Sequence, residues 1–176
     1  MSEAWPWGRL LAWPAPRGPE RRLTLEAGTE IRAQVARDLD LEDVRRLAAG
    51  IVVRPWLDGL EFEGRVEASV TRLCGVSLEP FDVFIDEPLK VRVVPEGSPN
   101  APRSEGEIIV DLEAEDPPDE APAEGVDPGA YVMEALALSL DPFPRKPGAV
   151  FEQPGDEGTI SPFAALAGLV KRPPSE

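Results

Sequence analysis

The chain has 176 residues, which suits one domain, and its composition excludes several classes of protein. It has 18 basic and 33 acidic residues, so its formal net charge is −15 and its surface as a whole repels a nucleic-acid backbone. The absence of histidine and the single cysteine, Cys74, exclude Ser-His and Cys-His catalytic pairs, an internal disulfide and a zinc cluster built from thiolates.

The hydropathy pattern indicates a water-soluble protein. No stretch approaches the roughly 18 consecutive apolar residues of a membrane helix. The first residues lack the basic start and apolar run of a secretory signal. A lone thiol also suits a reducing compartment. We therefore expect a cytoplasmic protein with no membrane association.

The N-terminal part is predicted to contain a covering segment and two short helices. Residues 1–22 are rich in proline and tryptophan and are expected to pack on the core, with short strands at residues 9–13 and 23–25. Apolar spacing over residues 29–48 predicts two helices. The first is capped by Thr29, and the second begins at Asp40 and is stopped by Gly50.

The middle of the chain predicts antiparallel hairpins. Apolar and polar residues alternate over residues 60–71, as in a strand with one buried face. The Asp58-Gly59 pair is a hairpin turn signal that joins this strand to residues 51–57. Further strands are expected at residues 81–94, with Pro88 at an edge or bulge, and at residues 107–112.

The C-terminal part predicts an acidic loop and two helices. Residues 113–127 are acidic and proline-rich, and we expect them to be disordered. One helix begins at Asp127-Pro128 and ends before Pro142, and another covers residues 161–170, ahead of a tail at residues 171–176. The prediction is an α+β fold with an antiparallel sheet core, forming a single domain over residues 23–170.

No motif for catalysis or cofactor binding is found. The chain has neither a phosphate-binding loop nor a dinucleotide fingerprint, so we expect no cofactor, no metal, no small-molecule substrate and no enzymatic activity. Cys74 is either a reactive thiol or a small buried hydrophobe, and the second interpretation is favoured because free cysteines are usually buried.

Charge is concentrated in one segment. Ten acidic residues and no basic residue lie between Glu105 and Asp127. Such a segment is either a solubilising stretch or a surface that attracts a basic partner. Arg145-Lys146 is either a basic hook for phosphate or solvated charge. The candidate partner-binding residues are therefore Asp111, Glu113, Glu115, Asp116, Asp119, Glu120, Arg145 and Lys146.

Three stretches resemble the YceD family, in its alphaproteobacterial form. They are residues 131–149, which include the Leu-Asp-Pro-Phe-Pro-Arg-Lys-Pro-Gly run, residues 161–166, and the central turn at residues 74–81, Cys-Gly-Val-Ser-Leu-Glu-Pro-Phe. The resemblance extends over roughly residues 20 to 170. The positions that match the family motif are Cys74, Asp141, Pro142, Pro144, Arg145, Lys146, Pro147 and Gly148.

The resemblance implies a role in the accumulation of large-subunit ribosomal RNA, with no catalytic residues to carry over. Many members have Cys-x2-Cys at the central turn and a later Cys or His, which suggests a metal site. Here the second position is Ser77 and the later ligands are missing, so a bound metal is not expected.

We therefore expect a ribosome-assembly factor that binds a basic large-subunit ribosomal protein, a large-subunit ribosomal RNA precursor, or both. One alternative is an enzyme that uses a divalent cation held by Asp111, Glu113, Glu115 and Asp116, because hard cations prefer oxygen ligands. Another is an acidic protein-interaction module unrelated to ribosomes.

Overall fold

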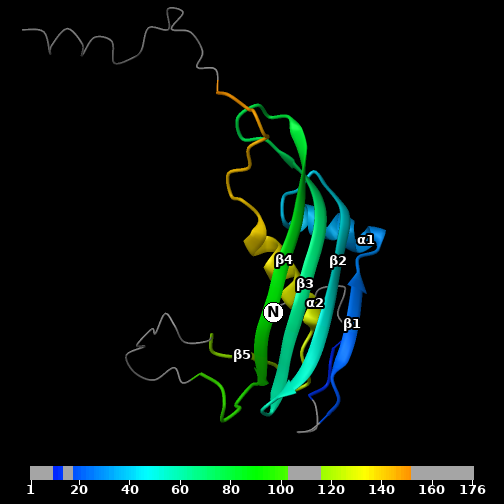
Figure 1. The fold of residues 1–176 in the computed structure, drawn as a ribbon, viewed down its shortest axis with the longest axis vertical. Helices are drawn as coiled ribbons and strands as arrows, with labels where there is room; N and C mark the ends of the chain where they lie inside the picture. The colour runs from blue at the N-terminus through cyan, green and yellow to red at the C-terminus, as the bar shows by residue number, and fades with distance from the viewer. Residues whose placement is uncertain (1–9, 14–17, 103–115, 152–176) are drawn as a thin grey trace, which may run out of the picture.

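The computed structural model describes residues 10–13, 18–102 and 116–151. Within them a twisted sheet carries two helices on one of its faces, so the α+β class with a sheet core is confirmed (Figure 1). The strands are β1 (Arg21–Glu26), β2 (Asp43–Trp56), β3 (Gly59–Leu73), β4 (Pro80–Pro95) and β5 (Asp119–Ala121), and they lie side by side in sequence order. The helices are α1 (Thr29–Asp38) and α2 (Pro128–Ser139).

The long hairpins form where the alternating pattern predicts them. β2 and β3 pair antiparallel from Asp43 opposite Thr71 to Trp56 opposite Gly59, so the predicted hairpin forms, with its turn at Leu57-Asp58 and Gly59 as the first residue of β3. β3 and β4 pair antiparallel in continuous register from Leu60 opposite Val93. One face of these strands is apolar and the other polar, because successive side chains of a strand point to opposite sides.

The apolar face is covered by the helices and makes the core. α1 packs on β2, and α2 packs on β3 and β4. The fully buried side chains come from strands and helices alike, and the largest are Phe62, Leu47, Ile51, Leu60, Leu136 and Val35. Neither helix in the described part of the chain has the length and apolar content that a membrane crossing requires.

The prediction of two N-terminal helices is wrong, because residues 43–48 begin strand β2. The register of β2 against β3 shifts between Val44 and Arg46, as in a β-bulge. The extra residue brings Val44 and Leu47 to the same buried face, three positions apart. Three-residue spacing is the signature of a helix, so the bulge produced the wrong prediction.

The cap of the first helix also differs from the prediction. Its N-cap is Gly28, with no side-chain cap, instead of Thr29. At α2 the prediction is confirmed, because the Asp127 side chain accepts the Gly129 N–H and Pro128 occupies the first turn. The predicted strand at residues 107–112 and the last helix at residues 161–170 lie outside the described residues, which contain one C-terminal helix instead of two.

Part of the expected acidic loop is ordered. Residues Asp119–Ala121 form β5, which pairs in parallel with Val93–Pro95 at the end of β4, so the sheet is mixed. Further along, Val126 is buried and forms an antiparallel bridge with Leu11. The sparse apolar residues Ala121 and Val126 anchor this segment, although its composition is typical of disorder.

The open edge of β4 and the two ends of the sheet determine where the candidate surfaces lie. Among the described residues, β4 pairs with β3 along its length but with β5 only at Val93–Pro95, so its second edge is open over most of the strand. Pro88 lies on that open stretch, as predicted for an edge position. The β3–β4 turn and β5 lie toward opposite ends of the sheet (Figure 1).

Candidate functional site

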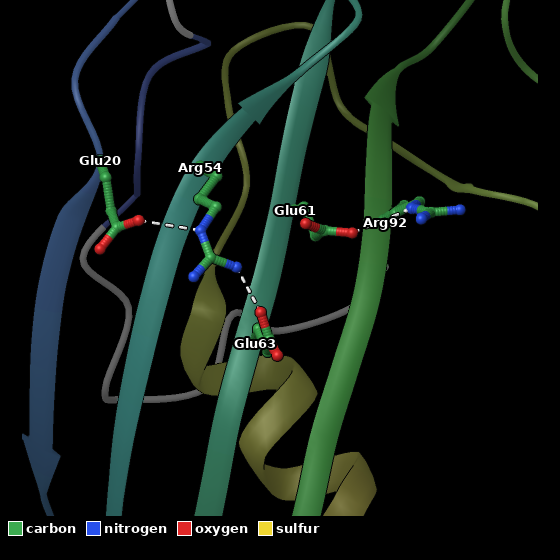
Figure 2. A network of polar contacts seen from close by, with 5 residues as sticks. All are labelled: Glu20, Arg54, Glu61, Glu63 and Arg92. Carbon is green, nitrogen blue, oxygen red and sulfur yellow. Dashed lines mark hydrogen bonds and ion pairs between the residues drawn. The ribbon is translucent and has the colours of Figure 1, made fainter.

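The open face of the sheet carries a ladder of ion pairs. Figure 2 shows Arg54 of β2 between Glu20, whose carboxylate is 2.9 Å from its Nε, and Glu63 of β3. On the neighbouring strands Arg92 Nε lies 3.0 Å from Glu61 Oε1. These contacts occur because the register places arginines and glutamates opposite one another on the wet face.

The same pairing continues toward the β3–β4 turn. Arg46 lies 2.8 Å from Glu67, and Arg65 lies 2.6 Å from Asp86, which lowers the pKa of the Asp86 carboxyl through a hydrogen bond from the guanidinium. Each of these guanidinium groups has a carboxylate partner. The open face is therefore a poor platform for a nucleic-acid backbone, which binds to uncompensated positive charge.

A groove runs beside the open edge of β4, between this strand and α2. Its volume is about 440 Å³. Residues 87–91 of β4 form one wall, α2 forms the other, and the segment that leads into β5 closes it. Apolar, acidic and basic residues share the lining: Leu89, Val91, Tyr131, Ala135 and Leu138 with Glu87, Asp116, Asp119, Glu134 and Lys90.

The carboxylates of this groove lack the partners that those of the open face have. Asp116, Asp119 and Glu134 form no ion pair with any other residue that the structure describes. Burial raises the pKa of Asp119. Burial also raises the pKa of Tyr131, and the charges of Asp119 and Glu134 add to that effect. Four acidic residues and one basic residue, Lys90, thus line the groove next to apolar surface, so the lining has an excess of acidic residues.

Local structure explains how these groups meet. The buried stripe of α2 consists of Val132, Met133 and Leu136, so Glu134 and Leu138, four residues apart, share the side that borders the groove. The parallel pairing of β5 with the end of β4 brings Asp119 to the same place. Sequence reasoning missed Glu87 and Glu134, although the i, i+4 spacing of Glu134 and Leu138 on α2 was a usable signal.

The predicted acidic residues divide into three sets. Asp116 and Asp119 line the groove. Glu120 does not line it, and its Oε2 accepts the Gly97 N–H at 3.5 Å. Asp111, Glu113 and Glu115 lie outside the described residues.

The positions of the family motif come together at the end of the sheet with the β3–β4 turn, although about 70 residues separate them in sequence. The Gly75 N–H donates to the Pro144 carbonyl at 2.8 Å, and the Lys146 N–H donates to Cys74 Sγ at 3.3 Å. The Lys146 ammonium lies 2.8 Å from Glu79, which lowers the pKa of that carboxyl. Backbone and side-chain contacts therefore join the loop at residues 141–148 to the turn after β3.

Cys74 is at the centre of this junction. It is fully buried, as predicted for a small hydrophobe, but its sulfur also accepts the N–H groups of Val76 and Ser77 at 3.4 Å. Hydrogen bonds from Ser77, and then from the Lys146 N–H, lower the pKa of the thiol to about 6. The sulfur thus accepts hydrogen bonds from several donors, and the part of the chain that the structure describes contains no group of three or more metal-ligating side chains around it.

The remaining motif residues shape the loop. The Asp141 carboxylate accepts the Phe143 N–H at 2.8 Å, and the Asp141 carbonyl accepts a hydrogen bond from Arg72 at 2.5 Å. Pro142, Pro147 and Gly148 are exposed, and Gly148 has φ of 80°, which favours glycine. Arg145 and Lys146 therefore lie at the β3–β4 turn, away from the Asp119 strand, and the structure does not unite the acidic and basic candidates in one site.

No family model, curated protein or solved structure matches this chain.

Proposed function

We propose that this protein is a non-catalytic binding protein for a basic component of the large ribosomal subunit, acting in the accumulation of large-subunit ribosomal RNA. The observation that carries the binding role is the groove between β4 and α2. Its carboxylates Asp116, Asp119 and Glu134 have no cationic partner among the described residues, whereas carboxylates of the open face do.

The groove has the chemistry that a basic protein segment requires. Its carboxylates attract lysine and arginine, and such complementary charge speeds association and selects the partner. Its apolar residues, among them Val91 and Leu138, can cover the aliphatic stems of those side chains. Ribosomal proteins carry basic segments that must be kept from premature contact with RNA, and a negative groove suits that task. The ribosomal assignment itself rests on the resemblance of residues 74–81 and 131–149 to the YceD family.

The binding role is tested with purified protein and a basic large-subunit ribosomal protein. We expect the triple variant Asp116→Asn, Asp119→Asn, Glu134→Gln to bind at least about tenfold more weakly, because each charge pair contributes on the order of 1 kcal/mol. The matched control is Glu63→Gln with Glu67→Gln, which removes carboxylates already paired with arginines. Equal weakening by both variants would show that net charge, and not the groove, governs binding.

The ribosomal role is tested in cells of the source organism. Deletion of the gene is expected to lower large-subunit ribosomal RNA selectively, with restoration by the intact gene and not by the triple variant. Unchanged ribosomal RNA together with intact binding of basic proteins would leave a general acidic interaction module. A shift in melting temperature on addition of Mg²⁺ or Ca²⁺ would favour the cation-dependent alternative.

A further inference from the structure

The loop at residues 141–148 is held rigidly by its backbone while two of its large side chains point outward. Its anchors are the Asp141 carbonyl on Arg72, the Pro144 carbonyl on the Gly75 N–H, and the Lys146 N–H on Cys74. Pro142, Pro144 and Pro147 fix the backbone further by restricting φ. The exposed side chains are Phe143, which is 77% exposed, and Arg145. A loop with this many anchors presents both side chains at low entropic cost.

Arg145 has no carboxylate partner among the residues that the structure describes. Lys146, next to it, forms an ion pair with Glu79. Arg145 forms no ion pair with a described residue, and its side chain instead lines a pocket of about 200 Å³ together with Arg72, Phe81 and Ser139. The carboxylate that lines this pocket is that of Asp141, and one of its oxygens already accepts the Phe143 N–H. Arg72 and Arg145 thus both line this pocket, where Arg72 also donates to the Asp141 carbonyl and the Ser139 hydroxyl donates to the Leu136 carbonyl.

An exposed aromatic ring beside such a pocket has a known use. Single-stranded nucleic acids bind to proteins by stacking bases on aromatic side chains while cationic groups hold the phosphates. Phe143 and Arg145, two residues apart on a fixed loop, provide one group of each kind. We infer that this loop, with the pocket lined by Arg72 and Arg145, is a binding site for single-stranded RNA, in which a base stacks on Phe143 and the adjoining phosphate lies between the arginines.

The position of the site fits this ligand. The uncompensated carboxylates line the groove farther along β4, toward β5, and the loop lies at the β3–β4 turn (Figure 1). The acidic groove repels a phosphate backbone, so an RNA strand is confined to the loop end of the molecule. The RNA site and the groove for a basic protein are therefore separate, and this inference does not depend on the proposed function.

The test measures the affinity of the full chain for a labelled single-stranded oligouridine by fluorescence anisotropy at several salt concentrations. Loss of the stacking platform in Phe143→Ala is expected to weaken binding about tenfold. Arg145→Glu is expected to weaken it at least as much and to reduce the dependence of log affinity on log salt by about one contact. Melting temperatures of the variants should match that of the wild type, since both side chains are exposed.

Matched controls isolate the site. Phe84→Ala removes an exposed phenylalanine from the open sheet face, and Arg22→Glu makes the same charge change on β1, so both should bind RNA like the wild type. The loop variants should still bind the basic protein, and the groove variants should keep the dependence of RNA binding on Phe143. The inference is overturned if the wild type does not bind the oligouridine, if Phe143→Ala binds it equally well, or if an acidic peptide competes as effectively as RNA.

Discussion

The open face of the sheet and the groove beside β4 carry the same kind of charged group in two different settings. On the open face, Glu61 and Glu63 meet arginines of neighbouring strands (Figure 2). In the groove, Asp119 and Glu134 meet apolar walls and other carboxylates. The net charge of −15 does not distinguish them. The difference teaches that net charge does not show which carboxylates the fold pairs, because those of the open face meet arginines whereas Asp119 and Glu134 form no ion pair with a described residue.

Both surfaces depend on the same sheet. The largest expected effect therefore comes from a substitution in the core of that sheet. Phe62 is fully buried in β3 and its ring lies 5.7 Å from that of Tyr131, which lines the groove. We expect Phe62→Ala to lower the free energy of unfolding by about 3–5 kcal/mol. Denaturant unfolding measures this, with Phe84→Ala, whose ring is 83% exposed, as a control expected to change little.

The ion pairs of the open face differ in their exposure to solvent. Arg92 and Glu61 are 19% and 16% exposed, and Arg92 also lies 5.0 Å above the Trp56 ring. Glu61→Gln should therefore lower the free energy of unfolding by about 1–2 kcal/mol, because it weakens a largely desolvated pair. Glu67→Gln breaks a pair that is 51–61% exposed and should cost less than about 0.5 kcal/mol. Equal losses in the two variants would contradict the role of burial.

The Cys74 sulfur, unlike the carboxylates of the open face, has no arginine partner among the described residues and accepts hydrogen bonds from Ser77 and from backbone N–H groups. Its pKa is about 6 in the folded protein against an ordinary value of 9.0, so folding favours the thiolate. A depressed folded pKa contributes stability above the unfolded pKa, and this contribution is lost as the pH falls through about 6. We expect thiolate absorbance to titrate near pH 6, with Cys74→Ala as the blank. A midpoint near 9 would contradict the hydrogen-bonded thiolate.

The smallest expected effect on stability concerns Asp119, which lines the groove. Burial raises the pKa of Asp119, so the folded state holds that proton more tightly than the unfolded state. Wild-type stability relative to Asp119→Asn should therefore rise as the pH falls through the titration of Asp119, and at neutral pH the variant should be equal or more stable by a few tenths of a kcal/mol. Thermal unfolding across acid and neutral pH measures the difference. A clear loss of stability at neutral pH would mean that Asp119 has a cationic partner.

The alternation of apolar and polar residues predicted most of the sheet. It failed at the start of β2, where one extra residue shifts the alternation. Continuous alternation identified β3 and β4, and Asp58-Gly59 identified the hairpin between β2 and β3. The bulge before Arg46 shifted the alternation of β2 and imitated a helix. β5 was missed because its order comes from pairing with the distant end of β4, which no local pattern records.

The candidate functional site, like the sheet, could be predicted from the sequence only in part. The sequence alone determined the charge balance, the absence of histidine chemistry, the amphipathic hairpins and the start of α2 at Asp127-Pro128, because these depend on residue type and short-range spacing. Only the tertiary structure decided which carboxylates meet an arginine, that Cys74 meets the Lys146 N–H, and that Arg145 has no ion-pair partner among the described residues. Those outcomes depend on strand register and loop closure, which bring together groups far apart in the chain.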